Sequence, residues 1–313
     1  MKRCLLIGNC QQYPLKILMQ SAPVFNERYE MIEPGPIHTW TTEQVDSAED
    51  RYNEADIILT QPIRDAKYGL AQTTRLLAFN ERRKRIPVIV FPNVDFIGFF
   101  PFTIRVPVDL EKDNVPDAHC GIVFLCYVSG LDEDAAVEYC KRFYSDERYS
   151  GIYKTIYELA LSRMESTERT FNIVTNTSYL FRSRYRDLKL MLNRLHPANV
   201  VCEFVANSVL SQLGIFETVT APMREFWTHD EMPVSVSVAK ALGIRYSDSS
   251  EYFYVKGILK RVDDYIRHLY WYYRGHPDVL SEAIIWNKQK ITTIGRIATN
   301  KYSNVDLMPL FKW

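Results

Sequence analysis

Three short apolar segments, each followed by polar residues, constrain the fold of this 313-residue chain more than any other feature. They are residues 3–8, 56–60 and 86–90. Continuous apolar runs of this length are typical of strands buried in a parallel sheet. Helical apolar spacing follows at 11–19 and 68–79. The sequence therefore predicts successive βαβ units with right-handed crossovers.

The polar residues after these strands form the predicted ligand site. They are residues 8–11, 61–68 and 91–93. The carboxyl ends of parallel strands meet at one edge of a sheet, and ligands of open α/β sheets bind at that edge. We therefore expect loops that are far apart in the sequence to line one crevice.

The remainder of the chain has mainly helical periodicity. Helices are expected at 132–143, 150–163, 199–213, 234–242 and 252–273, and an apolar run predicts one more strand at 171–175. The pattern predicts an α/β protein, with a parallel sheet and flanking helices at 1–115. A mainly helical portion at 116–313 is expected to pack on it and complete the site. Since no linker separates the two parts, one continuous domain is the alternative.

The balance of charge restricts the partners. The chain has 38 Lys and Arg against 38 Asp and Glu, a formal net charge of zero. Nucleic-acid-binding surfaces and polybasic membrane anchors need an excess of cations, so we expect no nucleic acid partner. No apolar run reaches the ~18–20 residues of a membrane span, and no export signal follows Met1. We expect a soluble, cytoplasmic protein.

The six cysteines predict neither disulfides nor a metal site. They lie far apart, form no CxxC pair and have no histidines at zinc-ligand spacing. Such usage is typical of a reducing compartment, and we expect no metal.

Cys10 is the candidate nucleophile. It lies in Gly8-Asn9-Cys10-Gln11, between the first strand and the first helix, where Gly permits a tight bend and a new helix offers unpaired backbone N–H groups. The positive end of that helix favours the thiolate, which is the reactive form of the side chain. The alternative is a small buried apolar residue, as most cysteines are. The flanking amides favour a role in the site.

His196 is the candidate general base. Pro197 suits the first position of the following helix, which would leave His196 near the N-cap. The helix dipole there disfavours the imidazolium and keeps the ring neutral, as a base requires. The alternatives are a capping or buried structural histidine, or His119, which also precedes a predicted helix and could be the base instead.

Two motifs together resemble a known arrangement. Gly8-Asn9-Cys10-Gln11 and Asn193-x-x-His196-Pro197 are similar, in order and form, to the Gly-Asp-Ser and Asp-x-x-His-Pro blocks of SGNH hydrolases and acyltransferases. Cys10 then stands at the serine position and Asn193 at the aspartate.

A longer ordered set of motifs, between residues 4 and 243, resembles the capsular-polysaccharide acetyltransferase family typified by WcbI. The motifs are Gly8-Asn9-Cys10-Gln11, Gln61-Pro62-Ile63 with Tyr68, Phe91-Pro92-Asn93 with Gly98-Phe99-Phe100-Pro101, Ser129-Gly130-Leu131, His196-Pro197-Ala198-Asn199, and Pro233-Val234 leading to Leu242-Gly243. One motif departs from the family pattern, which we expect as Asn-His-Pro, because Arg194 and Leu195 intervene here. The role of Asn193 is therefore open.

The resemblance implies an SGNH- or flavodoxin-like sheet, coenzyme A binding, and O-acetylation of a capsule sugar of the deoxy-heptose type. The residues then expected at the reaction centre are Cys10, His196, Gln11 and Asn193. Those expected at the cofactor are Gly8, Asn9, Gln61, Arg64, Asn93, Arg182, Arg184, Arg186 and Asn199.

The arginines are candidates because coenzyme A carries a pyrophosphate and a 3′-phosphate, so a neutral chain needs a local cluster of cations. The cluster Arg182, Arg184, Arg186, Lys189 and Arg194 contains a single acid, Asp187. Arginine can bind phosphate through two parallel hydrogen bonds. A solvated helix face is the alternative interpretation. Arg64, at the carboxyl end of the second strand, is a further candidate.

The leading hypothesis is an acetyl-CoA-dependent sugar O-acetyltransferase. Cys10 either carries the acetyl group or lines the thioester site while His196 activates the sugar hydroxyl. The backbone N–H groups of Cys10 and Gln11, with nearby side-chain amides, would hold the oxyanion. Two alternatives are an SGNH-like thiol esterase and a non-catalytic CoA- or nucleotide-binding component of a capsule-assembly complex. Further expected partners are capsule-assembly proteins or a second copy of the chain.

Overall fold

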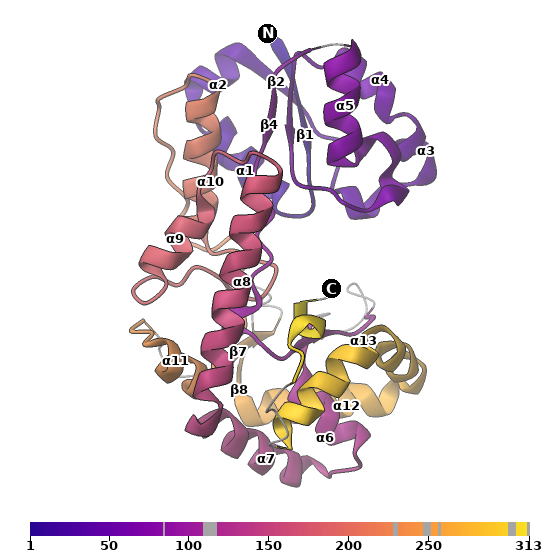
Figure 1. Cartoon of the computed structure of the whole chain (residues 1–313), viewed down its shortest axis with the longest axis vertical. Coiled ribbons are helices and arrows are strands. Elements are labelled where there is room, and N and C mark those ends of the chain that lie inside the picture. The colour runs from indigo at the N-terminus through magenta and orange to yellow at the C-terminus, as the bar shows by residue number, and fades with distance from the viewer. Residues whose placement is uncertain are drawn as a thin grey trace. The chain divides into compact units, whose positions relative to one another are not determined.

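The computed structural model describes residues 1–83, 85–108, 118–227, 231–246, 252–255, 258–299 and 305–311. The chain divides into two compact units (Figure 1). The first unit comprises Met1–Val94, Arg163–Arg182 and Pro197–Phe226. The second unit comprises Asp95–Ser162, Ser183–His196 and Trp227–Trp313. Whether the portion from 116 onward packs on the N-terminal portion to complete a site stays a prediction.

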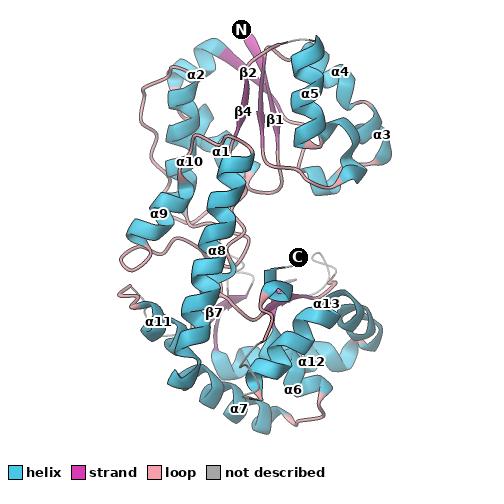
Figure 2. Cartoon of the chain, in the orientation of Figure 1, coloured by secondary structure: helices cyan, strands magenta, loops and turns pink. Residues whose placement is uncertain are grey.

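A parallel four-stranded sheet forms the centre of the first unit (Figure 2). Its order is β2-β1-β3-β4, with β1 at Lys2–Ile7, β2 at Tyr29–Ile32, β3 at Ile57–Thr60 and β4 at Val88–Val90. The three predicted strands are confirmed. β2 was not predicted, because it is an edge strand without a fully buried residue and therefore lacks a continuous apolar run.

Helices cover both faces of this sheet. They are α1 (Gln12–Gln20), α2 (Pro23–Arg28), α3 (Thr42–Asp46), α4 (Ala48–Glu54), α5 (Thr73–Arg83) and α10 (Asn199–Gln212). In Figure 1, α3, α4 and α5 lie on one side and α1, α2 and α10 on the other. Leu5 and Ile58 of the sheet form one buried cluster with Tyr52 of α4 and Leu76 of α5. The predicted α/β architecture with a parallel sheet is confirmed.

Most of the second unit is helical, as predicted. Its helices are α6 (Gly121–Val128), α7 (Glu133–Ser145), α11 (Val236–Leu242), α12 (Val262–Gly275) and α13 (Pro277–Ala298). Two helices, α8 (Ser150–Thr170) and α9 (Thr177–Arg184), contribute residues to both units. Antiparallel pairs join β5 (Thr103–Arg105) to β6 (Ala118–Cys120) and β7 (Tyr252–Val255) to β8 (Ile258–Arg261).

Short 3-10 segments complete the described elements. They are η1 (Ile37–Thr39), η2 (Ala66–Ala71), η3 (Ile97–Phe99), η4 (Glu147–Tyr149) and η5 (Met308–Phe311). Within the described residues, no helix has both the length and the apolar character needed to cross a membrane.

Two predicted elements are wrong. The segment 171–175 is a turn and loop rather than a strand: Asn172 has a φ of +50°, in the left-handed region that strands do not use. Its apolar residues Phe171 and Ile173 are instead buried against Val90. The predicted helix at 252–273 begins only at Val262, because the residues before it form the β7–β8 pair.

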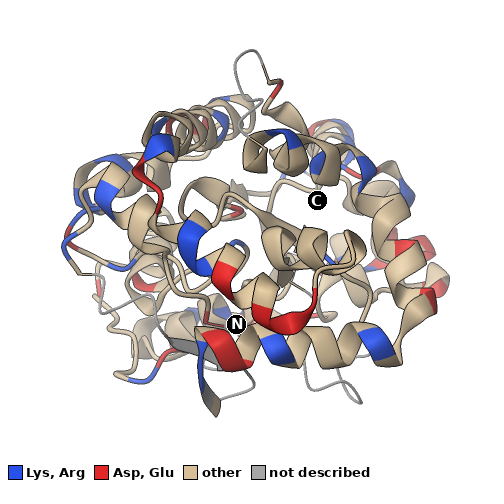
Figure 3. Ribbon diagram, turned by 90° about the horizontal axis from the view of Figure 1, so that it is seen from below, with Lys and Arg blue, Asp and Glu red and all other residues tan. Residues whose placement is uncertain are grey.

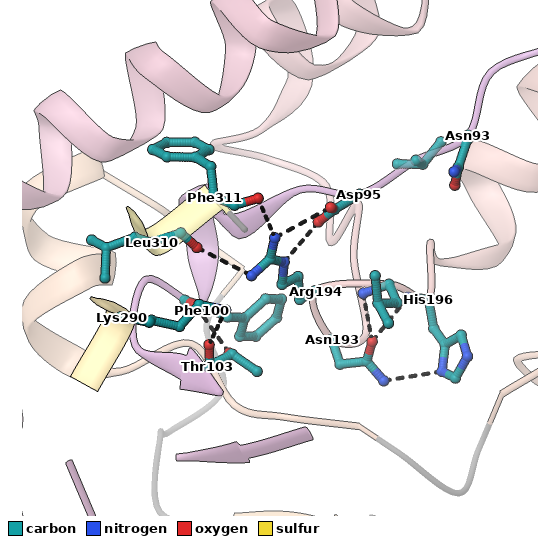
Figure 4. A network of polar contacts seen from close by, with 12 residues as sticks. Asn93, Asp95, Phe100, Thr103, Asn193, Arg194, His196, Lys290, Leu310 and Phe311 are labelled. Atoms are coloured by element: carbon teal, nitrogen blue, oxygen red, sulfur yellow. Dashed lines mark hydrogen bonds and ion pairs between the residues drawn. The ribbon is translucent and has the colours of Figure 1, made fainter. Parts of the chain in front are cut away.

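A buried guanidinium ties the second unit together. Arg194 is 1% exposed. Its Nε and Nη2 donate to the two oxygens of Asp95 at 2.7 and 3.2 Å, and Nη1 and Nη2 donate to the carbonyl oxygens of Leu310 and Phe311 at 3.2 and 3.1 Å (Figure 4). The Arg194 carbonyl accepts from the N–H of Phe96 at 2.9 Å. One side chain therefore fixes three segments that are remote in the sequence.

Lys290 of α13 is buried near this ion pair. Its ammonium donates to the Thr103 carbonyl at 3.4 Å. Burial lowers the pKa of Lys290 to about 7; the positive charge of Arg194 acts in the same direction, and the Asp95 carboxylate opposes it.

We expect Arg194→Ala to lower the free energy of unfolding by about 3 kcal/mol, because it leaves a carboxylate and two carbonyl oxygens without their donor. Urea denaturation would measure the loss. Arg245→Ala is the matched control, since Arg245 pairs with Asp187 on the surface and is 70% exposed; that change should cost less than about 1 kcal/mol. Equal losses in the two variants would contradict the structural role of Arg194.

Candidate functional site

The loops that follow β1, β3 and β4 are joined by the side-chain amide of Gln61. Its Oε1 accepts from the backbone N–H of Asn9 at 2.7 Å. Its Nε2 donates to the Pro92 carbonyl at 3.2 Å and to Gln11 Oε1 at 3.3 Å. Gln61 is 1% exposed. The predicted meeting of the three loops at one edge of the sheet is therefore confirmed.

Gln11 and Asn9 extend this network. Gln11 Nε2 donates to the Val94 carbonyl at 2.9 Å, and Gln11 Oε1 accepts from the Val94 N–H at 3.0 Å. Asn9 Nδ2 donates to Asn93 Oδ1 at 3.1 Å. Four predicted site residues, Asn9, Gln11, Gln61 and Asn93, thus form one connected set of amides.

Gly8 is required by close packing. A Cβ atom at this position would lie 2.8 Å from Gln61 Oε1. Gly8 is not among the glycines with positive φ. Glycine is therefore needed here for a different reason than the expected tight bend: a side chain would displace Gln61 from the loop that it holds.

Cys10 lies between β1 and α1 and is partly exposed. All six cysteines of the chain are described; the other five, Cys4, Cys120, Cys126, Cys140 and Cys202, are buried. Burial raises the pKa of Cys4 to about 12 and also raises that of Cys202. Cys10 is therefore the cysteine that a ligand or reagent can reach.

Backbone N–H groups at the start of α1 were expected to be unpaired, but they are hydrogen-bonded within the loop. The Gln11 N–H donates to Asn9 Oδ1 at 2.9 Å. Those of Gln12 and Tyr13 donate to the carbonyl oxygens of Asn9 and Cys10 at 3.0 and 3.1 Å. Pro14 has no N–H. The Gln11 N–H is consequently engaged within the loop rather than presented to a ligand oxygen.

His196 does not cap a helix. The N-cap of α10 is Ala198, and the helix begins at Asn199, so neither Pro197 nor His196 occupies the predicted position. The ring is partly buried and stacks on Trp227 with centroids 4.9 Å apart and planes 3° apart. Burial lowers the pKa of His196 to about 4, which leaves the ring neutral at pH 7. The expected neutrality therefore has burial, not the helix dipole, as its cause.

Asn193 holds His196 through both ends of its amide (Figure 4). Its Oδ1 accepts from the backbone N–H groups of Leu195 and His196 at 2.8 and 2.9 Å. Its Nδ2 lies 3.0 Å from His196 Nδ1. Asn193 and His196 belong to the second unit and Cys10 to the first, so their association at one reaction centre stays a prediction.

His119, the second candidate base, has the surroundings of a core histidine. It lies in β6 and is 0% exposed. Its Nδ1 is 2.9 Å from the hydroxyl oxygen of Tyr273, and its ring packs against those of Tyr272 and Tyr273.

The cations of the 182–194 cluster have separate partners. Arg182, in the first unit, pairs with Glu165 at 2.6 Å. In the second unit Lys189 pairs with Glu231. Arg194 is held inside the protein, so the five cations do not form one solvated face. Figure 3 shows basic and acidic residues interleaved along the helices.

The other three candidate arginines, like Arg182, lie at the surface. Arg184 and Arg186 are exposed, and Arg186 Nε donates to the Tyr185 hydroxyl at 3.0 Å. Arg64 donates to Thr167 Oγ1 at 2.9 Å and lies over the ring of Phe171.

Asn199 holds a neighbouring loop. Its Nδ2 donates to the carbonyl oxygens of Pro222 and Arg224 at 2.8 and 2.9 Å, its Oδ1 accepts from the Phe226 N–H at 3.0 Å, and its own N–H donates to Glu225 at 2.6 Å. These bonds occupy most of the side chain that was expected to contact the cofactor.

The stacking of Trp227 on His196 and the pairing of Asp95 with Arg194 were not predicted from the sequence. Neither Trp227 nor Asp95 stands in a recognisable motif, and a stacking or ion-pair partner remote in the sequence leaves no local periodicity. Sequence analysis also missed a cavity of about 330 Å³ in the second unit, whose lining includes Phe99–Phe102, Tyr144, Pro233 and Val236. Within the described residues, no three His, Cys, Asp or Glu side chains are grouped to hold a metal ion.

Comparison with known proteins gives two matches. The family model described as "polysaccharide biosynthesis enzyme WcbI" matches residues 3–218. The solved structure of WcbI, described as a polysaccharide biosynthesis enzyme, superposes with a TM-score of 0.72 at 17% identity and covers 99% of each chain. That structure is described as the native protein without a disulfide bond between CoA and a cysteine. At this identity the likeness shows the fold. No curated protein sequence matches the chain.

In the native protein we expect a single cysteine, Cys10, to react rapidly with a thiol reagent such as DTNB, because the other five are buried. Absorbance of the released product would count the fast thiols. Cys10→Ala should abolish the fast phase, whereas Cys202→Ala should leave it unchanged. A fast phase that survives in Cys10→Ala would contradict this assignment.

Proposed function

The chain belongs to the WcbI family of polysaccharide biosynthesis enzymes, and we propose that it transfers an acetyl group from acetyl-CoA to a hydroxyl of a capsule sugar of the deoxy-heptose type. Cys10 and His196 are proposed to lie at the reaction centre. The observation that carries the proposal is the position of Cys10: it is the partly exposed cysteine, and it lies after β1 between Asn9 and Gln11, whose amides are fixed by hydrogen bonds to the neighbouring loops. The similar solved protein is described with reference to CoA and a cysteine, in a form without a disulfide bond between them, and this mention of CoA supports the choice of cofactor.

In the proposed reaction the Cys10 thiolate attacks the thioester carbonyl carbon. A bond forms between Cys10 Sγ and the acyl carbon, and CoA leaves as its thiolate, which takes up a proton. The sugar oxygen then attacks the acyl-cysteine. Its proton passes to solvent or a nearby base, and Cys10 is released as thiolate. In the alternative route the sugar attacks the thioester directly, and Cys10 only lines the site.

The cofactor would be held at two ends. Gly8, Asn9, Gln61 and Asn93 are proposed for the thioester end. Gly8 and Asn9 directly precede Cys10 in the sequence, and Gln61 and Asn93 are hydrogen-bonded to Asn9. Gln11 is proposed for the reaction centre, where its side chain is fixed by the backbone of Val94, and Asn199 is proposed to shape the site through the loop that it holds.

The phosphates would be held by the proposed arginines: Arg64, Arg182, Arg184 and Arg186. Arg184 and Arg186 are exposed, as a phosphate ligand must be before binding. Arg182 would have to exchange its ion pair with Glu165 for a phosphate.

Binding of CoA tests the first half of the proposal. A ligand present at 100 times its dissociation constant should stabilise the protein by about 2.7 kcal/mol, which thermal denaturation with CoA, acetyl-CoA and adenosine 3′,5′-bisphosphate would reveal. Arg184→Ala and Arg186→Ala should each weaken binding roughly 10-fold, as loss of a charge-assisted bond does. Arg75→Ala, an exposed arginine of α5 outside the proposed site, is the control. The absence of any response to CoA species would refute the proposal.

Transfer through Cys10 tests the second half. Acetyl-CoA without a sugar should leave wild-type chain with the added mass of one acetyl group, because the acyl-cysteine has no acceptor; intact-protein mass spectrometry would detect it. Cys10→Ala should remain unmodified and lose transfer to the sugar, while Cys202→Ala should behave as wild type. If Cys10→Ala transfers at the wild-type rate, the direct route holds. Release of acetate at the same rate with and without sugar would instead indicate the thiol esterase.

A further inference from the structure

The orientation of the Asn193 amide is determined by its neighbours. Two backbone N–H groups, those of Leu195 and His196, point at one end of the amide at 2.8 and 2.9 Å. Only the oxygen can accept from them, since an NH₂ group there would face two donors. The Nδ2 end is therefore the one that lies 3.0 Å from His196 Nδ1.

That orientation fixes the tautomer of His196. Asn193 Nδ2 is only a donor, so Nδ1 of the ring must accept and cannot carry a proton. A neutral imidazole has one N–H, and with Nδ1 acting as acceptor the proton is on Nε2. The ring is neutral at pH 7, because burial lowers its pKa to about 4.

The arrangement is the reverse of a Ser-His-Asp triad. There a carboxylate accepts from Nδ1–H, and the bare Nε2 removes a proton from the nucleophile. Here an amide donates to Nδ1, so Nε2 presents a hydrogen. Neutral imidazoles in this state polarise carbonyl groups in other enzymes.

We propose that Asn193 is a positioning residue that locks His196 as the Nε2–H tautomer, and that His196 acts as a hydrogen-bond donor to the thioester carbonyl oxygen rather than as a general base. The tautomer follows from the contacts of the second unit alone. The identity of the oxygen rests on the proposed function. The inserted residues Arg194 and Leu195 contribute to this arrangement. Arg194 anchors the turn to Asp95, and the Leu195 N–H fixes the orientation of the Asn193 amide.

The tautomer can be measured in the ligand-free protein. Long-range ¹H–¹⁵N NMR of histidine-labelled protein distinguishes Nε2–H from Nδ1–H rings, and His196→Gln would identify the His196 signal among the six histidines. We expect the Nε2–H form at pH 7. An Nδ1–H form, or a rapid average of the two, would overturn the proposal.

Asn193→Asp provides the matched variant. A carboxylate can still accept from the Leu195 and His196 N–H groups, so the backbone turn is retained, but it must accept from Nδ1–H as well. The variant should therefore switch His196 to the Nδ1–H form. Asn26→Asp, the same change at an exposed position of α2, should leave the His196 signal unchanged. Persistence of the Nε2–H form in Asn193→Asp would show that Asn193 does not set the tautomer.

The oxygen that His196 contacts is tested with two probes in the same NMR measurement. A ketone analogue of acetyl-CoA, which keeps the carbonyl oxygen but cannot transfer its acyl group, should shift the Nε2 resonance. Adenosine 3′,5′-bisphosphate should not; an equal shift with this probe would mean that His196 contacts a phosphate and would overturn the thioester assignment. If neither probe stabilises the protein, the proposed function fails while the tautomer is still measured.

Discussion

The buried carboxamide of Gln61 is the contact on which the geometry of the strand ends depends. Its oxygen takes the N–H of Asn9, and its nitrogen reaches the loop after β4. A buried amide that loses such partners incurs the full cost of its desolvation, about 1–3 kcal/mol. The absence of a side chain at Gly8 is what lets Gln61 approach so closely. Sheet order and this one amide together place Cys10 at a defined point of the edge.

A second fixed point is the turn between Asn193 and His196. Arg194 is directed into the protein and pairs with Asp95, while Asn193 binds two backbone N–H groups and the ring of His196. The two residues that interrupt the expected Asn-His-Pro motif are thus part of what holds the histidine. Arg194, which the sequence placed in a candidate phosphate-binding cluster, is a structural residue of the second unit.

The strands and their polar ends could be predicted because buried parallel strands leave continuous apolar runs, as at Leu5 and Ile58. The location of the amide network at the strand ends could be predicted. Its hydrogen-bond partners could not, since Gln61 and Asn9 are remote in the sequence. Local apolar spacing failed at 171–175, where burial against Val90 imitates a strand. The same criterion failed at Tyr252–Val255, where the aromatic residues before α12 led to the prediction of a longer helix although they form β7. The burial of Arg194 depends on the partner Asp95, which no local pattern identifies.

The amides of the strand-end loops have a chemical consequence of their own. Asn9, Gln11, Gln61 and Asn93 carry no ionisable group, so the hydrogen bonds among them neither form nor break as the proton concentration changes. These hydrogen-bonded loops beside Cys10 should therefore keep the same geometry at acidic and at alkaline pH, as long as the chain stays folded. A rate that varies with pH would then report on the thiol, the histidine and the substrate themselves, not on a scaffold that rearranges around them.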